Sequence, residues 1–337
     1  MNQDSFATTA GPAALPAAKT VVLLKPRGFC AGVVRAIDIV NIALETYGAP
    51  IYVRKEIVHN HHVVVDLSRK GAIFLDAVEE VPEGARIIFS AHGVSPDVRR
   101  VAAERRLQVI DATCPLVTKV HLEAVHFARE GYSIVLIGHK DHDEVIGTLG
   151  EAQEQTWLIS SEEEVHSLNV PNPSRVAYLT QTTLSLGETK GIIAALRAKY
   201  PDIVAPPAQD ICYATENRQV AVKAVASLCN LLLVVGSSNS SNSNRLVEVA
   251  ANAGLPSYLI EDETSIDGRW LEKVRTVGVT AGASAPEFLV AKVVDFLKSQ
   301  GFGRVQEVEP VSEDVRFALP PELVSLETEN TRISSNL

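Results

Sequence analysis

The stretch KPRGFCAGV, residues 25–33, joins a short apolar run to an amphipathic pattern. The run VVLL at 21–24 is typical of a buried strand, and the apolar positions Ile37, Val40 and Leu44 predict a helix after it. Cys30 therefore lies where a strand gives way to a helix, with a glycine two residues to each side. Glycine lets the backbone turn sharply and lets a bulky group come close to it. We expect a functional thiol at this turn.

Two further cysteines have the same setting. Cys114 follows a predicted strand at 107–111 and precedes a helical run. Cys212 follows Ile203-Val204 and then the stretch AQDI at 208–211, and it precedes a predicted helix. Cys229 differs, because it lies between that helix and an apolar run, where a small buried residue is expected. The first three cysteines are 84 and 98 residues apart, and the chain contains no CxxC metal motif.

Helical and strand patterns alternate through the chain, which predicts an α/β protein with mostly parallel sheets. Ligands of such sheets bind beyond the carboxyl ends of the strands. Three similar modules that place their strand ends around one centre would bring the three cysteines together. The predicted division is a disordered N-terminal tail, three α/β modules and a C-terminal tail, at residues 1–19, 20–113, 114–210, 211–310 and 311–337.

Composition narrows the classes of function. The 337 residues include 46% hydrophobic and 21% charged residues, as in an ordinary soluble protein. A net charge of −10 argues against nucleic acid as a partner, and 5% aromatics leave few base-stacking residues. The apolar runs are too short to cross a membrane. Residues 1–19 lack the basic start of a secretory signal, so we expect a cytoplasmic protein without structural disulfides.

Two kinds of polar loop follow the predicted strands. His59, His92 and His142 form one set, each in a short polar segment. The run GSSNSSNSNR at 236–245 lies between a buried strand and a helix, where backbone N–H groups bind anions. Ser284 repeats this arrangement before a proline suited to a first helical turn. Neither GxxxxGK[ST] nor GxGxxG occurs, so we expect a smaller phosphorylated ligand.

The residues alone leave the chemistry open. Three cysteines with one histidine fit a zinc-dependent hydrolase as well as they fit an iron–sulfur enzyme. A third interpretation is a non-enzymatic iron–sulfur carrier or sensor.

Several stretches together match one known family, in order, from about residue 20 to 310. The chain resembles the 4-hydroxy-3-methylbut-2-enyl diphosphate reductases, the last enzymes of the methylerythritol phosphate route to isoprenoids. The matching stretches are PRGFCAGV (26–33), SAHGV (90–94), DATCPLV (111–117), TQTTLS (180–185), DICYAT (210–215), the Ser/Asn run and GVTAGASAP (278–286).

The resemblance implies a [4Fe–4S] cluster with one iron that has no protein ligand, at the centre of the three modules. The implied reaction removes the allylic hydroxyl of the diphosphate substrate, with electrons from a one-electron donor protein of ferredoxin or flavodoxin type. It implies these roles: Cys30, Cys114 and Cys212 as cluster ligands, Glu144 as proton donor, Thr182 as its hydrogen-bonding partner in catalysis and substrate binding, and His59, His92, His142, Ser240, Ser241, Asn242 and Ser284 around the diphosphate.

Overall fold

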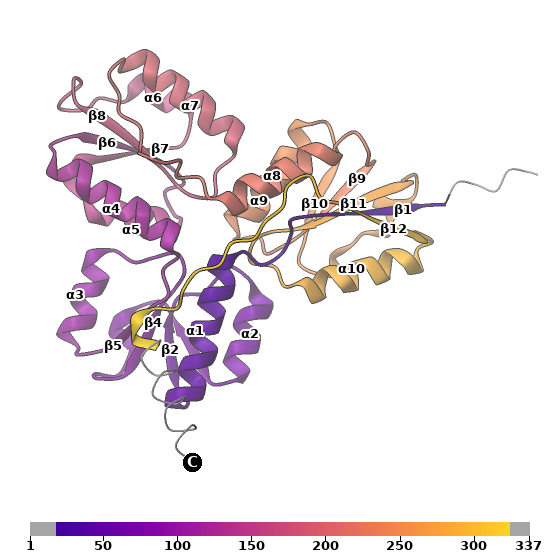
Figure 1. Cartoon of the computed structure of the whole chain (residues 1–337), viewed down its shortest axis with the longest axis horizontal. Coiled ribbons are helices and arrows are strands. Elements are labelled where there is room, and N and C mark those ends of the chain that lie inside the picture. The colour runs from indigo at the N-terminus through magenta and orange to yellow at the C-terminus, as the bar shows by residue number, and fades with distance from the viewer. Residues whose placement is uncertain (1–17, 324–337) are drawn as a thin grey trace, which may run out of the picture.

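The computed structural model describes residues 18–323, which form three lobes (Figure 1). Each lobe contains one sheet, and every strand pair within the described residues is parallel. The predicted α/β class is therefore confirmed. The predicted N-terminal tail lies outside the described residues except for 18 and 19, and so does 324–337 of the predicted C-terminal tail.

The first lobe is built on a four-stranded sheet in the order β3-β2-β4-β5. Successive residues of β4 face opposite layers: Ile88 packs with α1 and α2, whereas Ile87 and Phe89 pack with α3. The elements are β2 (Ile51–Arg54), β3 (Ala72–Leu75), β4 (Arg86–Phe89), β5 (Gln108–Asp111), α1 (Ala31–Tyr47), α2 (His61–Arg69), α3 (Pro96–Glu104) and the 3₁₀ turn Val78–Glu80.

The second lobe contains a three-stranded sheet in the order β7-β6-β8. All five residues of β6 and all five of β8 are buried, as expected for strands that are covered on both faces. Its elements are β6 (Ser133–Ile137), β7 (Thr156–Ile159), β8 (Val176–Thr180), α4 (Pro115–Arg129), α5 (Asp143–Glu151), α6 (Glu162–Ser167), α7 (Leu186–Lys199) and the 3₁₀ turn Gln153–Gln155.

The third lobe contains a five-stranded sheet in the order β10-β9-β11-β1-β12. Helix α10 covers one face, and α8 and α9 cover the other. Its elements are β1 (Thr20–Leu24), β9 (Leu231–Val235), β10 (Ser257–Ile260), β11 (Thr276–Ala281), β12 (Arg304–Val308), α8 (Tyr213–Val225), α9 (Ser241–Asn252), α10 (Glu287–Ser299) and the 3₁₀ turns Glu263–Ser265 and Gly268–Leu271.

Strand β1 departs from the predicted division of the chain. The sequence predicts one module over residues 20–113, but β1 pairs with β11 and β12 of the third lobe, whereas α1 packs in the first. The reason is burial: Val21 and Val22 point into opposite apolar layers of the five-stranded sheet. The loop at 25–30 then carries the chain from one lobe to the other.

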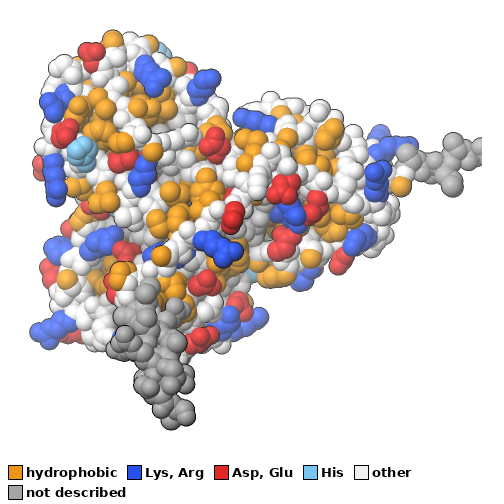
Figure 2. Space-filling model, viewed as in Figure 1, with side chains coloured by type: hydrophobic (Ala, Val, Ile, Leu, Met, Phe, Trp, Pro, Cys, Tyr) orange, Lys and Arg blue, Asp and Glu red, His pale blue; other side chains and the backbone are white. Residues whose placement is uncertain are grey.

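The end of the described chain returns along the same path. After β12, residues 309–323 run from the third lobe across the junction to the first (Figure 1). On the face shown in Figure 2, acidic and basic side chains are interspersed over all three lobes. Among the helices of residues 18–323, none combines the length and apolar character needed to span a bilayer.

Candidate active site

Three cysteines begin three helices at the junction of the lobes. Cys30 is the N-cap of α1, Cys114 that of α4 and Cys212 that of α8. All three line one cavity, although they come from distant parts of the chain. The N-terminal end of a helix favours negative charge, so each thiol lies where a thiolate is stabilised.

The two glycines beside Cys30 have different roles. Gly28 has φ +68°, a left-handed conformation that suits glycine, and therefore makes the turn. Gly32 lies in α1, where a Cβ would come within 2.8 Å of Cys114 Sγ and 3.8 Å of Cys30 Sγ. The absence of a side chain at Gly32 thus opens the space between two of the sulfurs.

In the metal-free protein, burial outweighs the effect of the helix ends at two of the thiols. Burial raises the pKa of Cys114 to about 12, and the neighbouring Cys30 and Cys212 raise it as well. Burial raises the pKa of Cys212 to about 11, with Cys30 again contributing. A positively charged metal centre would reverse this preference, because metal binding releases the thiol protons. The sulfur donors and the space beside Gly32 fit an iron–sulfur cluster.

The three predicted histidines meet at the same cavity. The rings of His59 and His92 are stacked with centroids 3.9 Å apart, and His142 meets His59 edge-on at 5.5 Å. Burial lowers the pKa of His142 to about 4 and the pKa of His92 well below its usual range, helped by the neighbouring rings. His142 Nδ1 accepts from the N–H of Glu144 at 3.2 Å, so the proton of the neutral ring is on Nε2.

Glu144 is 3% exposed and faces the cavity together with Thr182. The backbone N–H of Thr182 donates to Oε1 at 2.6 Å, and the Thr182 hydroxyl donates to Oε2 at 3.0 Å. Burial raises the pKa of Glu144 to about 7, against the lowering effect of these two hydrogen bonds. The carboxyl group can therefore exchange a proton near neutral pH.

The Ser/Asn run begins α9 and lines the opposite part of the cavity wall. Ser240 is the N-cap of α9, and the Ser241 hydroxyl accepts from Thr183 Oγ1 at 3.0 Å. Asn242 bridges two loops: its Oδ1 accepts from the N–H of Ala283, and its Nδ2 donates to Thr215 Oγ1. The neighbouring Ser284 hydroxyl donates to the carbonyl of His59 at 2.9 Å. All the predicted site residues thus lie around one cavity.

Some residues of the site were not singled out from the sequence. Thr215 contacts Cys212 through its backbone N–H at 3.4 Å and its hydroxyl at 3.2 Å; its place in the first turn after the cysteine was the available signal. Lys55 forms an ion pair with Asp143 and contributes to the low pKa of His92. Phe317, from the predicted C-terminal tail, also lines the cavity, and no local pattern marked it.

Comparisons with known proteins agree on one family. A family model described as LytB protein matches residues 21–298. A 4-hydroxy-3-methylbut-2-enyl diphosphate reductase of Acidothermus cellulolyticus is 56% identical over 306 residues, 90% of each chain. One of Rhodococcus jostii is 56% identical over 311 residues, 92% of this chain and 93% of the relative.

Solved structures agree as well. The E-1-hydroxy-2-methyl-but-2-enyl-4-diphosphate reductase of Plasmodium falciparum superposes with a TM-score of 0.90 at 40% identity, covering 93% of this chain and 99% of that one. A structure described as the terminal enzyme of the non-mevalonate pathway gives a TM-score of 0.60 at 30% identity, covering 83% and 99%.

Fold and site define an α/β protein in which three cysteine-capped helices converge on one cavity. The family model matches most of this chain, and the two reductases above are more than half identical to it. The chain therefore belongs to the LytB protein family. The comparisons give no support to the zinc hydrolase or the non-enzymatic carrier.

Proposed function

We propose that the protein is a 4-hydroxy-3-methylbut-2-enyl diphosphate reductase. It converts (E)-4-hydroxy-3-methylbut-2-enyl diphosphate into isopentenyl and dimethylallyl diphosphate, the last step of the methylerythritol phosphate pathway. The observation that carries this proposal is one cavity that combines three thiols, a buried carboxyl group and a Ser/Asn loop. The similarity of the chain to named reductases supports it.

Cys30, Cys114 and Cys212 would hold a [4Fe–4S] cluster. The segments 20–113, 114–210 and 211–310 contribute one cysteine each, although β1 of the first segment belongs to the sheet of the third lobe. When bound, such a cluster supplies single electrons and, at the iron without a protein ligand, Lewis-acid activation of the substrate hydroxyl. The N-terminal ends of α1, α4 and α8 favour the thiolate form of each ligand.

The diphosphate would bind to neutral donors. The N-terminus of α9, with Ser240, Ser241 and Asn242, presents hydroxyl, amide and backbone N–H groups to an anion. Ser284 and the uncharged rings of His92 and His142 complete the site, with His59 stacked on His92. Neutral donors bind an anion without placing several uncompensated positive charges in a buried cavity.

Glu144 would give a proton to the departing oxygen. Hydroxide is a poor leaving group, and protonation converts it to water. The carboxyl group has a pKa of about 7, so a large share of it is protonated at neutral pH. Thr182 fixes its orientation through two hydrogen bonds.

The overall reaction breaks one carbon–oxygen bond and forms one carbon–hydrogen bond. It consumes two electrons and two protons and releases one water molecule. The electrons would come from a one-electron donor protein of ferredoxin or flavodoxin type. Protonation at either end of the allylic unit accounts for two isomeric products.

The test is anaerobic reconstitution followed by a coupled measurement. The purified protein should contain iron and acid-labile sulfide, and with a chemical reductant it should convert the hydroxylated diphosphate to both isomers, detected by mass spectrometry. A protein that holds the cluster but leaves the substrate unchanged would be a carrier, and one that binds zinc and no sulfide would be a different enzyme.

A further inference from the structure

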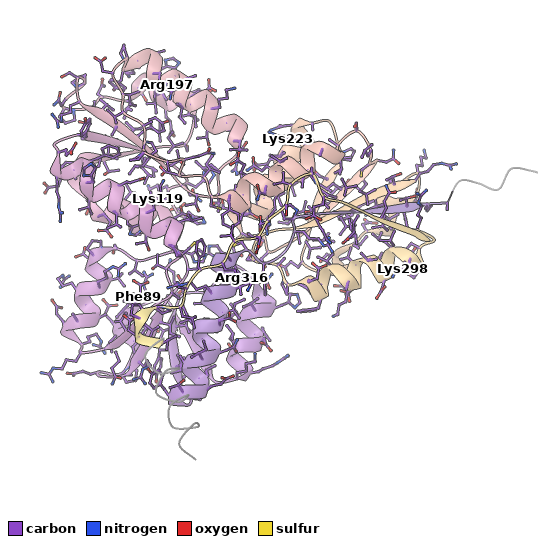
Figure 3. The ribbon with its side chains drawn as sticks, in the orientation of Figure 1. Phe89, Lys119, Arg197, Lys223, Lys298 and Arg316 are labelled. Atoms are coloured by element: carbon purple, nitrogen blue, oxygen red, sulfur yellow. The ribbon has the colours of Figure 1, made fainter. Side chains whose placement is uncertain are left out.

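Residues 309–323, here called the C-terminal strap, cross the junction of the three lobes (Figure 1). Leu319 and Leu323 pack into the apolar core of the first lobe. Phe317 lines the cavity that holds the three cysteines. Arg316, on the same segment, lies near the centre of the molecule in Figure 3. The strap therefore forms part of the cavity wall.

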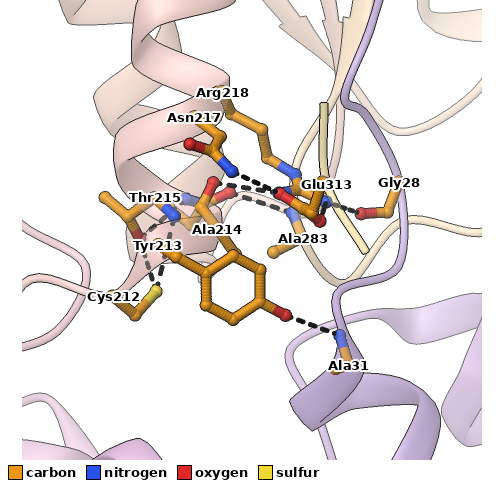
Figure 4. A network of polar contacts seen from close by, with 11 residues as sticks. Gly28, Ala31, Cys212, Tyr213, Ala214, Thr215, Asn217, Arg218, Ala283 and Glu313 are labelled. Carbon is orange, nitrogen blue, oxygen red and sulfur yellow. Dashed lines mark hydrogen bonds and ion pairs between the residues drawn. The ribbon is translucent and has the colours of Figure 1, made fainter. Parts of the chain in front are cut away.

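Arg218 attaches the strap to two cysteine-bearing segments (Figure 4). Its side chain is 0% exposed and forms an ion pair with Glu313 of the strap at 3.1 Å. The same guanidinium donates to the carbonyl of Gly28 at 2.7 Å, two residues before Cys30, and to that of Ala214 at 2.9 Å. Ala214 is the second residue of α8, two residues after the N-cap Cys212.

Arg35 makes the corresponding link to the third cysteine. It lies on α1, is 9% exposed, and its Nε donates to the carbonyl of Ala318 in the strap at 2.7 Å. Its Nη1 donates to the carbonyls of Ala112 and Thr113, at 3.2 and 3.1 Å. Thr113 directly precedes Cys114. Phe317 lies between the two attachment points, at 313 and 318.

We propose that Arg218 and Arg35 are positioning residues that clamp the C-terminal strap onto the loops of all three cysteines, and that the clamped strap closes the cavity through Phe317. A planar guanidinium can reach several acceptors at fixed angles, which lysine cannot. Each arginine uses this geometry to join one strap residue to a cysteine-bearing loop. As far as it concerns the cluster, this inference rests on the proposed function; the closure itself does not.

Burying the two arginine side chains costs desolvation free energy, which apolar side chains at the same positions would not cost. A buried ion pair is often no more stabilising than apolar side chains of similar volume. Removing one member, in contrast, leaves the other charge buried and unpaired. Loss of Arg218 therefore leaves Glu313 of the strap without its ion-pair partner, and loss of Arg35 leaves the carbonyl of Ala318 without its donor, while the apolar cores of the lobes remain.

The first test is limited proteolysis of the full chain with thermolysin, with and without its cluster. Arg218→Met and Arg35→Met should each accelerate cleavage within 309–323 on the order of 10-fold or more, while cleavage within β6 and β9 stays unchanged as the control of the fold. Arg316→Met, at an exposed arginine of the same strap, is the matched control and should be cleaved like the parent protein. Parent-like cleavage in both buried variants would overturn the clamp. If either fails to fold, Glu313→Gln provides the milder change.

The second test measures access to the cavity. In the metal-free full chain, the arginine variants should alkylate at Cys30, Cys114 and Cys212 at least about tenfold faster, since local opening limits labelling. Cys229, packed in the third lobe, should react at the parent rate. Phe317→Ala should accelerate the same labelling without accelerating cleavage of the strap. Unchanged labelling in all three variants would refute closure, whether or not the protein proves to be a reductase.

A third measurement separates positioning from general stability. In the reconstituted protein, Arg218→Met should change the electron paramagnetic resonance spectrum of the cluster and hasten iron loss to a chelator, because two of its ligand loops lose a shared anchor. Arg316→Met should change neither. A parent-like spectrum together with parent-like iron release would show that Arg218 does not position the ligands.

Discussion

Thr182 holds the carboxyl group of Glu144 by both of its oxygens, with the backbone N–H at 2.6 Å and the hydroxyl at 3.0 Å. Both hydrogen bonds favour the charged form, whereas burial favours the neutral form and raises the pKa to about 7. The balance between them sets the pH at which this carboxyl group can give up a proton.

The Thr182→Val variant tests that balance. Loss of the hydroxyl removes a hydrogen bond to the carboxylate, so the pKa of Glu144 should rise above about 7. A proton donor must be protonated, and turnover should therefore fall at high pH with a midpoint near the pKa. In Thr182→Val this high-pH limb should move upward by about one pH unit. The hydroxyl of the neighbouring Thr183 donates to Ser241 and not to Glu144, so Thr183→Val should leave the midpoint in place.

Replacement of the proposed proton donor, Glu144, should separate binding from chemistry. Glu144→Gln keeps the size of the side chain and can still form hydrogen bonds, but it cannot readily supply a proton. We expect parent-like iron content and substrate binding, with turnover lower by about 10²-fold or more. Steady-state rates and substrate titration monitored by cluster spectroscopy measure both. Glu154→Gln, at an exposed position, is the control; normal turnover in Glu144→Gln would exclude its role as proton donor.

The four cysteines provide their own comparison. Cys30→Ala, Cys114→Ala and Cys212→Ala should each lower bound iron and abolish turnover. Cys229→Ala should do neither, because this residue packs in the apolar core of the third lobe. Iron and sulfide analysis after reconstitution gives the result. Full iron content in any of the first three variants would remove that cysteine from the ligand set.

Gly32→Ala should have different effects on the metal-free and the reconstituted protein. Alanine is favoured over glycine in a helix by about 1 kcal/mol, and in the metal-free chain the Cys114 thiol can rotate away from the added Cβ, so the stability of that chain should stay close to that of the parent. The added Cβ would lie 2.8 Å from Cys114 Sγ, so cluster content should fall sharply. Gly187 is also the second residue of its helix, and its Cβ would meet nothing closer than 3.8 Å. Gly187→Ala should therefore reconstitute normally; equal iron content in both variants would contradict the role of Gly32.

Two residues of the loops proposed to bind the diphosphate should differ in their effects. Ser284→Ala removes a hydroxyl at the cavity and should weaken substrate binding by about 1–3 kcal/mol without changing the cluster spectrum. Asn242→Ala should weaken binding and also alter that spectrum, because Asn242 holds Thr215, which contacts Cys212. Calorimetric titration and absorption spectra distinguish them. Identical behaviour of the two variants would show that the Asn242 bridge is unimportant for Cys212.

The site was more accessible to sequence reasoning than the arrangement of the strands. Cys30, Cys114 and Cys212 were recognisable because each is preceded and followed by short local patterns, which depend only on neighbouring residues. The partners of β1 were not, since a buried apolar run fits a central position in any parallel sheet. The same limit applies to Phe317 and to the anchors of the strap. Their role depends on contacts between residues far apart in the chain.

The position of β1 also affects how this protein can be made. Thr20 pairs with Thr276, 256 positions further along the chain (276 − 20), and β1 fills the slot between β11 and β12. During synthesis on the ribosome, the N-terminal strand must wait unpaired until nearly the whole polypeptide has emerged. Only then does the loop that follows it, with Cys30, reach its final place. Cofactor loading is therefore expected to follow release of the finished chain, and no shortened N-terminal fragment should acquire the complete set of ligands.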